Sequence, residues 1–150
     1  MKKLIFLMSA ALLLSAHTLF AKPYETAVNN KIQHTFSESF SGAKEVKWYT
    51  DDNITFTAKF TMVNTRVTAF FNDDGTLLAT SRYLQADQLP LNVISRLNKK
   101  FPATSIYCVV EYAAGENALY YITLEGKDTW TIVRADRFGS LKVQNHLKKA

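Results

Sequence analysis

Cysteine is nearly absent from this sequence, which holds only Cys108. No disulfide can form within the chain, and this excludes the class of small proteins that disulfides hold together. Cys108 lies in the apolar run from Ile106 to Val110, a setting that favours a small buried hydrophobic side chain. A reactive thiol or a bridge between two copies of the chain is the alternative.

Apolar runs long enough to span a membrane are missing as well. The N-terminal stretch from Leu4 to Leu14 reaches only about half of the roughly 20 residues that a spanning helix needs. It follows Lys2 and Lys3 and precedes small residues near Ala21, which is the pattern of a cleavable secretory signal peptide. The sequence therefore predicts export, with no stable membrane insertion.

Cleavage is expected after Ala21, with Ala16 as the alternative position. This places a signal peptide over residues 1–21 and one exported domain over residues 22–150, which is long enough to bury a core of ordinary size. No cysteine follows the cleavage position, so no lipid anchor is expected. We predict a periplasmic or secreted protein.

Catalytic motifs are also missing. The sequence contains no Gly-x-Ser-x-Gly elbow, no His-Glu-x-x-His, no phosphate-binding glycine loop and no Cys-x-x-Cys. The histidines beyond the signal peptide, His34 and His146, lie far apart in the chain, and with a buried thiol they make a poor nucleophile and base. We therefore expect no catalytic residues, no cofactor and no enzymatic activity.

Positive charge is in small excess. The formal net charge of +5 includes the two lysines of the signal peptide, and so modest an asymmetry is typical of a solvated surface, so nucleic acid is not an expected partner. The acidic pairs Asp51-Asp52 and Asp73-Asp74 could offer oxygens to a cation such as calcium. Neither pair has the spacing of a calcium loop, and Asp favours tight turns. We predict turns and no metal site.

Two segments have the periodicity of a helix with one apolar face. Pro90 suits the first turn of the second helix, and Pro102 disfavours its continuation. The apolar positions are Val28, Ile32, Phe36 and Phe40 in the first segment and Ile94, Leu97 and Phe101 in the second.

Strand patterns follow each helix. Extended runs at 46–49 and 106–111 each lead to a strand with alternating apolar residues. This alternation indicates that one face of the strand is buried in the core. The next strands, Arg66 to Phe71 and Thr129 to Ala135, end at turns in which Gly75 and Gly139 can take a positive φ. The alternating apolar residues are Phe56, Ala58 and Phe60 in the first half and Tyr120, Ile122 and Leu124 in the second.

These patterns form an internal repeat, in which a helix followed by strands occurs twice. When Gly75 is aligned with Gly139, the alternating strands match at one constant offset. We therefore predict an α+β fold of two tandem α-β-β-β-β units, at about residues 24–86 and 87–147, with each helix packed on an antiparallel sheet.

Three features of the sequence are typical of a known family: Phe40-x-x-Ala43-x-x-Val46-x-Trp48, the alternating strand before Asp74-Gly75, and Leu89-Pro90 ahead of the second helix. In these features the chain resembles the PepSY-like family of exported bacterial proteins, which is related in fold to beta-lactamase-inhibitor-like proteins. The resemblance spans almost all of the exported domain and implies its fold, but structural motifs do not transfer a function. Inhibitory relatives carry disulfides, which this chain cannot form, so no functional residue is taken from them.

The candidate binding surface is the sheet face opposite the helices. If Phe56, Ala58 and Phe60 point to the core, strand alternation sends Tyr121 to the other face, and the repeat match adds four further residues. Aromatic residues beside arginine are typical of protein interfaces. The alternatives are that this face is buried between the two units, or that a shift of one residue in strand phase places Trp130 in the core, where Trp48 is expected. The predicted partner-binding residues are Trp130, Tyr121, Phe70, Arg66 and Arg134.

These observations predict an exported binding module without catalytic activity. We expect its aromatic and basic face to hold a protein or peptide partner of the cell envelope. Inhibition of that partner is one role that such binding can serve. The alternative is a small-ligand or envelope-glycan binding protein, because aromatic platforms also serve that purpose.

Overall fold

The computed structural model describes residues 22–150, so the predicted signal peptide at residues 1–21 lies outside the described residues. Nine strands form one antiparallel sheet in which neighbours in the chain are also neighbours in the sheet. The strands are β1 (Tyr24–Glu25), β2 (Lys44–Thr50), β3 (Thr55–Met62), β4 (Thr65–Asn72), β5 (Leu77–Leu84), β6 (Ser105–Ala114), β7 (Asn117–Glu125), β8 (Thr129–Asp136) and β9 (Leu141–Lys148). Helix α1 (Asn30–Ser39) precedes β2, and the 3-10 turn η1 (Ala86–Gln88) and helix α2 (Leu91–Lys100) precede β6. The predicted α+β fold with an antiparallel sheet is confirmed.

Both helices cover the same face of this sheet. Val67 packs in the core beneath α1 and Tyr120 in the core beneath α2. One row of paired residues, Val67, Arg82, Glu111 and Tyr120, connects them across four strands, and paired residues of an antiparallel sheet point to the same side. We call this side the helix face and the opposite side the open face.

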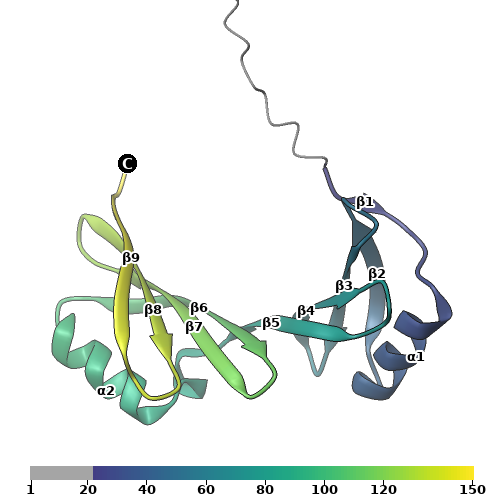
Figure 1. The fold of residues 1–150 in the computed structure, drawn as a ribbon. Coiled ribbons are helices and arrows are strands. Elements are labelled where there is room, and N and C mark those ends of the chain that lie inside the picture. The colour runs from purple at the N-terminus through teal and green to yellow at the C-terminus, as the bar shows by residue number, and fades with distance from the viewer. Residues whose placement is uncertain (1–21) are drawn as a thin grey trace, which may run out of the picture.

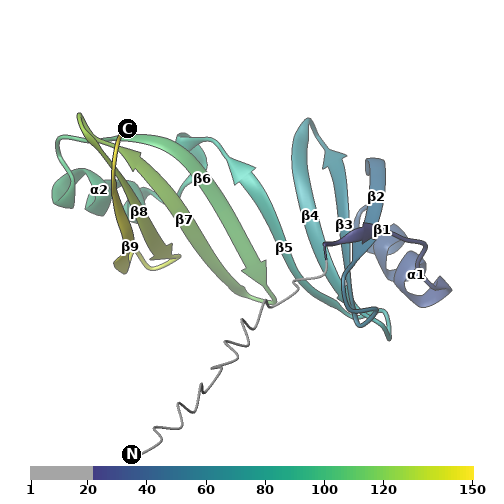
Figure 2. The same cartoon turned by 90° about the horizontal axis from the view of Figure 1, so that it is seen from above.

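The sheet is bent, and the open face is the concave side of this bend, which we call the hollow (Figure 1). Figure 1 shows the sheet rising on both sides of β5, with α1 and α2 on the outer side of the bend. Figure 2, seen from above, shows the two helices at opposite ends of the strongly twisted sheet. The open face therefore spans both halves of the molecule without a helix over it.

The core beneath α1 is built on aromatic rings. Asn29 caps the helix by accepting a hydrogen bond from the Ile32 amide at 3.0 Å. The ring centroid of Phe36 lies 5.1 Å from that of Phe60 and 5.2 Å from that of Trp48. The predicted apolar stripe on this helix and the predicted core position of Trp48 are confirmed.

The core beneath α2 is aliphatic. Val93 and Leu97 are buried against β7 and β8, where Ile122, Leu124 and Val133 are also buried. Pro90 is the N-cap of the helix, which ends at Lys100, directly before Phe101. The helix ends where the sequence predicts, because Pro102 cannot continue it. Among residues 22–150, no helix has the length and hydrophobicity to cross a membrane.

Cys108 lies in a setting that differs from the predicted one. It is half-buried and pairs with Thr123 on the open face. The register shift between Ile106 and Cys108 changes the strand phase, so the prediction of a buried Cys108 is wrong. His146 lies in β9, where its Nδ1 is 2.9 Å from the Thr131 hydroxyl.

The turn at Gly75 supports a first prediction, because α1 lies directly against it. Gly75 has a φ of +93°, and a Cβ at this position would lie 2.9 Å from the Cβ of Lys31. We expect Gly75→Ala to lower the free energy of unfolding by about 1 to 3 kcal/mol through backbone strain alone, and further because α1 must move. Urea denaturation measures this loss.

Gly42 provides the matched control. Its φ is +89°, but an added Cβ there would have no neighbour within 4 Å. Gly42→Ala therefore introduces backbone strain without a contact. Equal losses at the two glycines would contradict the packing of α1 on the Gly75 turn.

Candidate functional site

All five predicted partner-binding residues lie on the open face. Ala58 and Phe60 are buried on the helix face, so the alternate residues of β3 point to the open face together with their partners Phe70 and Arg66 on β4. Tyr121 lies between Tyr120 and Ile122, which are buried beneath α2. The predicted strand phase is confirmed, and the binding role of these residues stays a prediction.

Tyr121 and Arg134 lie side by side on this face. They are directly paired on β7 and β8. Tyr121 also pairs with Val110 on β6, which in turn pairs with Tyr83 on β5. Tyr83 is 60% exposed and Tyr121 is 38% exposed. This row across β5 to β8 therefore presents two tyrosines to solvent together with Arg134.

Phe70 lies in a second aromatic contact on the open face. Its ring centroid is 5.8 Å from that of Tyr112 on β6. Phe70 is half-buried, whereas Tyr112 is 38% exposed. The contact bridges β5 and joins the two halves of the open face.

Trp130 lies apart from the other predicted residues. On β8 it is four residues from Arg134, which corresponds to about 13 Å along a strand. Its indole contacts Tyr107 at a centroid distance of 4.8 Å, and the Lys149 ammonium lies 4.8 Å from the indole centroid. Lys149 is also paired with Glu125 at 2.6 Å. The structure thus brings Tyr121 and Arg134 together and places Trp130 in a separate aromatic cluster at one end of β8.

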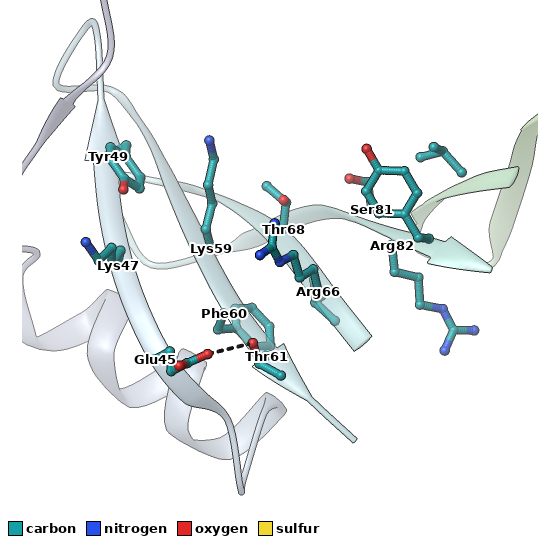
Figure 3. A pocket seen from close by; sticks show the side chains of 13 residues that line it. Glu45, Lys47, Tyr49, Lys59, Phe60, Thr61, Arg66, Thr68, Ser81 and Arg82 are labelled. Carbon is teal, nitrogen blue, oxygen red and sulfur yellow. Dashed lines mark hydrogen bonds between the residues drawn. The ribbon is translucent and has the colours of Figure 1, made fainter. Parts of the chain in front are cut away.

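A groove of about 540 Å³ opens on the open face over β2 to β5. Figure 3 shows Lys47, Lys59 and Arg66 projecting from three neighbouring strands. The Lys59 ammonium lies 5.0 Å from the centre of the Tyr49 ring, close enough for a cation–π contact. The residues lining the groove are Glu45, Lys47, Tyr49, Lys59, Phe60, Thr61, Arg66, Val67, Thr68, Ser81, Arg82, Tyr83 and Val110.

The groove is positively charged. Its single carboxylate, Glu45, accepts a hydrogen bond from the Thr61 hydroxyl at 3.1 Å. Arg82 is paired with Glu111 on the helix face and points away from the groove in Figure 3. In the part of the chain that the structure describes, no carboxylate lies within ion-pair distance of the remaining three cations.

The sequence predicted Arg66 as a partner-binding residue but did not predict the groove. Lys47 and Lys59 both lie on the polar side of their strands, and this alternation is the sequence feature that could have indicated them as residues of the groove. Their adjacency depends on the pairing of β2 with β3, which places Lys47 directly opposite Lys59. Tyr83 was missed because its strand lacks a clear alternation.

The acidic pairs stabilise turns, as predicted. Asp52 accepts hydrogen bonds from the amides of Thr55 and Ile54, at 2.7 and 2.8 Å, and these bonds hold the pKa of its carboxyl below the ordinary value. A hydrogen bond from the Thr76 hydroxyl lowers the pKa of Asp74 in the same way. Within residues 22–150, no group of three His, Cys, Asp or Glu residues is arranged to hold a metal ion.

Three solved structures share this fold. A BLIP-like protein from Bacteroides fragilis has a TM-score of 0.69 at 15% identity, over 83% of this chain and 90% of its own. A DUF2874 family protein from Bacteroides ovatus has a TM-score of 0.67 at 19% identity, over 82% and 89%. A proposed periplasmic protein from Bacteroides eggerthii has a TM-score of 0.66 at 14% identity, over 82% and 90%.

Comparison of the sequence with family models and with curated proteins found no further relative. No family model matches the chain, and no curated protein matches it. At these identities the likeness concerns the fold, and it confirms the resemblance to the beta-lactamase-inhibitor-like fold.

Proposed function

We propose that the chain is an exported, non-enzymatic binding module whose open face holds a protein or peptide partner of the cell envelope. The observation that carries this proposal is the presence of exposed tyrosines beside Arg134 on a hollow face that no helix covers. Tyrosine and arginine are enriched at the centres of protein interfaces. Inhibition of the partner follows if the hollow covers the partner's own functional site.

The proposed location is the periplasm or the cell exterior. The signal-peptide pattern over residues 1–21 supports it. Further support comes from the shared fold with a BLIP-like protein and with a proposed periplasmic protein. We propose that residues 22–150 form the exported domain.

We further propose that this domain consists of two repeats, residues 24–86 and 87–147. In each, a helix precedes four strands. Gly75 and Gly139 occupy equivalent turns with positive φ, and an added Cβ at either would touch the preceding helix, at Lys31 or Arg96. Two repeats joined edge to edge through β5 and β6 account for an open face that spans both.

Photo-cross-linking in intact cells tests this function. We expect a photoreactive amino acid in place of Tyr121 to capture a distinct envelope protein. The same substitution at Leu91, which is 82% exposed at the start of α2, is the control and should not capture it. Capture at Leu91 with none at Tyr121 would contradict the proposed interface.

A second candidate is a small-ligand or glycan binding protein. The volume of the groove, about 540 Å³, falls within the range of small-molecule sites. Size-exclusion chromatography with envelope extract separates the two candidates, because a protein partner changes the elution volume and a small ligand does not.

A further inference from the structure

Two lysines occupy directly paired positions on the open face, and neither forms an ion pair within residues 22–150. Lys47 on β2 is directly paired with Lys59 on β3, and Arg66 lines the same groove from β4. Like charges directly opposite each other destabilise a sheet. The nearest lining carboxylate, Glu45, is bound to Thr61. Lys59 has its cation–π contact with Tyr49, but within residues 22–150 no ion pair compensates the like charges of the two lysines.

The same arrangement recurs in the other half of the open face. Arg134 on β8 is directly paired with Lys142 on β9. Neither side chain forms an ion pair within residues 22–150. Two opposed pairs of cations thus flank the central tyrosines, Tyr83 and Tyr121.

The basic cluster on α2 has a different explanation. Lys99 and Lys100 lie in the last turn of the helix, where positive charge stabilises the helix through its dipole. Strand lysines on β2 and β3 gain no such stabilisation. A structural reason therefore exists for the cations on α2, whereas the cation–π contact of Lys59 with Tyr49 leaves the positive charge of the groove without a carboxylate partner.

We propose that the groove of Lys47, Lys59 and Arg66 takes an acidic polypeptide segment. This inference rests on the function proposed above and names the chemistry of the partner. Carboxylates over the groove would relieve the repulsion between the lysines and pair with Arg66. Tyr49 and Tyr83, which also line the groove, provide the aromatic surface that polypeptide segments use and that a small inorganic anion does not need.

A decaglutamate peptide is a suitable probe, titrated into the purified exported protein at low salt and followed by isothermal calorimetry. We expect saturable binding that weakens as salt is added, because exposed charges are screened. The double variant Lys47→Gln and Lys59→Gln should bind about fivefold more weakly or worse, as expected when two exposed ion pairs are lost. Its urea midpoint should stay close to that of the parent, because the change removes the repulsion together with the cation–π contact of Lys59.

The matched control is the double variant Lys99→Gln and Lys100→Gln, which removes the same charge from the helix face. It should weaken binding by less than about twofold, since distant charges contribute little at moderate salt. Equal weakening by both double variants would show attraction to net charge alone and overturn the proposal. Absence of saturable binding, or displacement of the peptide by inorganic phosphate at equal concentration, would also overturn it.

The result is separable from the test of the proposed function. If the Tyr121 cross-link forms but decaglutamate does not bind, the open face is an interface and the acidic segment is wrong. If decaglutamate binds in the groove but no protein is captured through Tyr121, the groove is confirmed and the wider interface is wrong.

Discussion

Replacing Phe36 by alanine is expected to lower the free energy of unfolding by about 3 to 5 kcal/mol. Phe36 is only 9% exposed and contacts four aromatic rings at centroid distances from 5.1 to 6.3 Å. The substitution leaves a cavity at the centre of the core beneath α1, which rigid neighbouring rings cannot fill. Urea denaturation of the parent and the variant measures the loss.

Phe60→Ala should cause a similar loss, because Phe60 is 3% exposed and packs edge-on against Phe36. Phe138 is the control: it is 73% exposed in the turn before β9, and Phe138→Ala should change stability by less than about 0.5 kcal/mol. A loss as small as this for Phe36 would mean that α1 does not pack on the sheet as described.

Truncating Tyr121 is expected to weaken binding of the partner by about 2 kcal/mol or more, which is roughly a thirtyfold increase in Kd. Tyr121 is 38% exposed at the centre of the hollow, so Tyr121→Ala removes interface area while the core stays intact. Stability should change by less than about 0.5 kcal/mol. Surface plasmon resonance with the partner captured through Tyr121 gives the affinity, and urea denaturation gives the stability.

Trp130→Ala tests how far the interface extends. The prediction is that it folds normally and loses binding as Tyr121→Ala does. An unfolded Trp130→Ala would show that the contacts with Tyr107 and Lys149 belong to the core. If Trp130→Ala keeps full affinity while Tyr121→Ala loses it, the aromatic cluster at Trp130 lies outside the interface, and the prediction for Trp130 is wrong.

The strand phase could be predicted from sequence because alternation is a local property. Ala58 and Phe60 alternate with Thr57 and Lys59, and in an extended chain this alternation alone decides which side chains are buried. The helix stripe around Phe36 is local in the same sense. Alternation placed Tyr121 on the open face, and the match between the two repeats placed the other four predicted residues there.

Bulges could not be predicted, because they depend on how one strand pairs with another. The register shift before Cys108 moved this residue out of the core. A second shift lies between Lys44 and Lys47, where Glu45 takes a φ of 55°. An extra residue in a strand leaves no clear mark in its sequence pattern, yet it reverses the direction of the side chains that follow.

The distances between residues of the open face could not be predicted from the sequence either. The sequence indicates that Phe70 and Trp130 share a face, but their strands, β4 and β8, are four positions apart in the sheet, roughly 19 Å at the ordinary spacing of strands. The opposition of Lys47 and Lys59 likewise arises from long-range pairing. Sequence therefore indicates the composition of the candidate interface, and the structure supplies its arrangement.

Hydroxyl-radical footprinting of the protein, alone and with the partner captured through Tyr121, tests the open face most directly. Tyr83 at 60% exposure and Phe138 at 73% exposure should both be oxidised in the free protein. The account predicts that the partner protects Tyr83 and Tyr121 while Phe138, in the turn beside α2, stays fully reactive. Protection of Phe138 with unchanged oxidation of Tyr83 and Tyr121 would place the partner on the helix face and contradict the account.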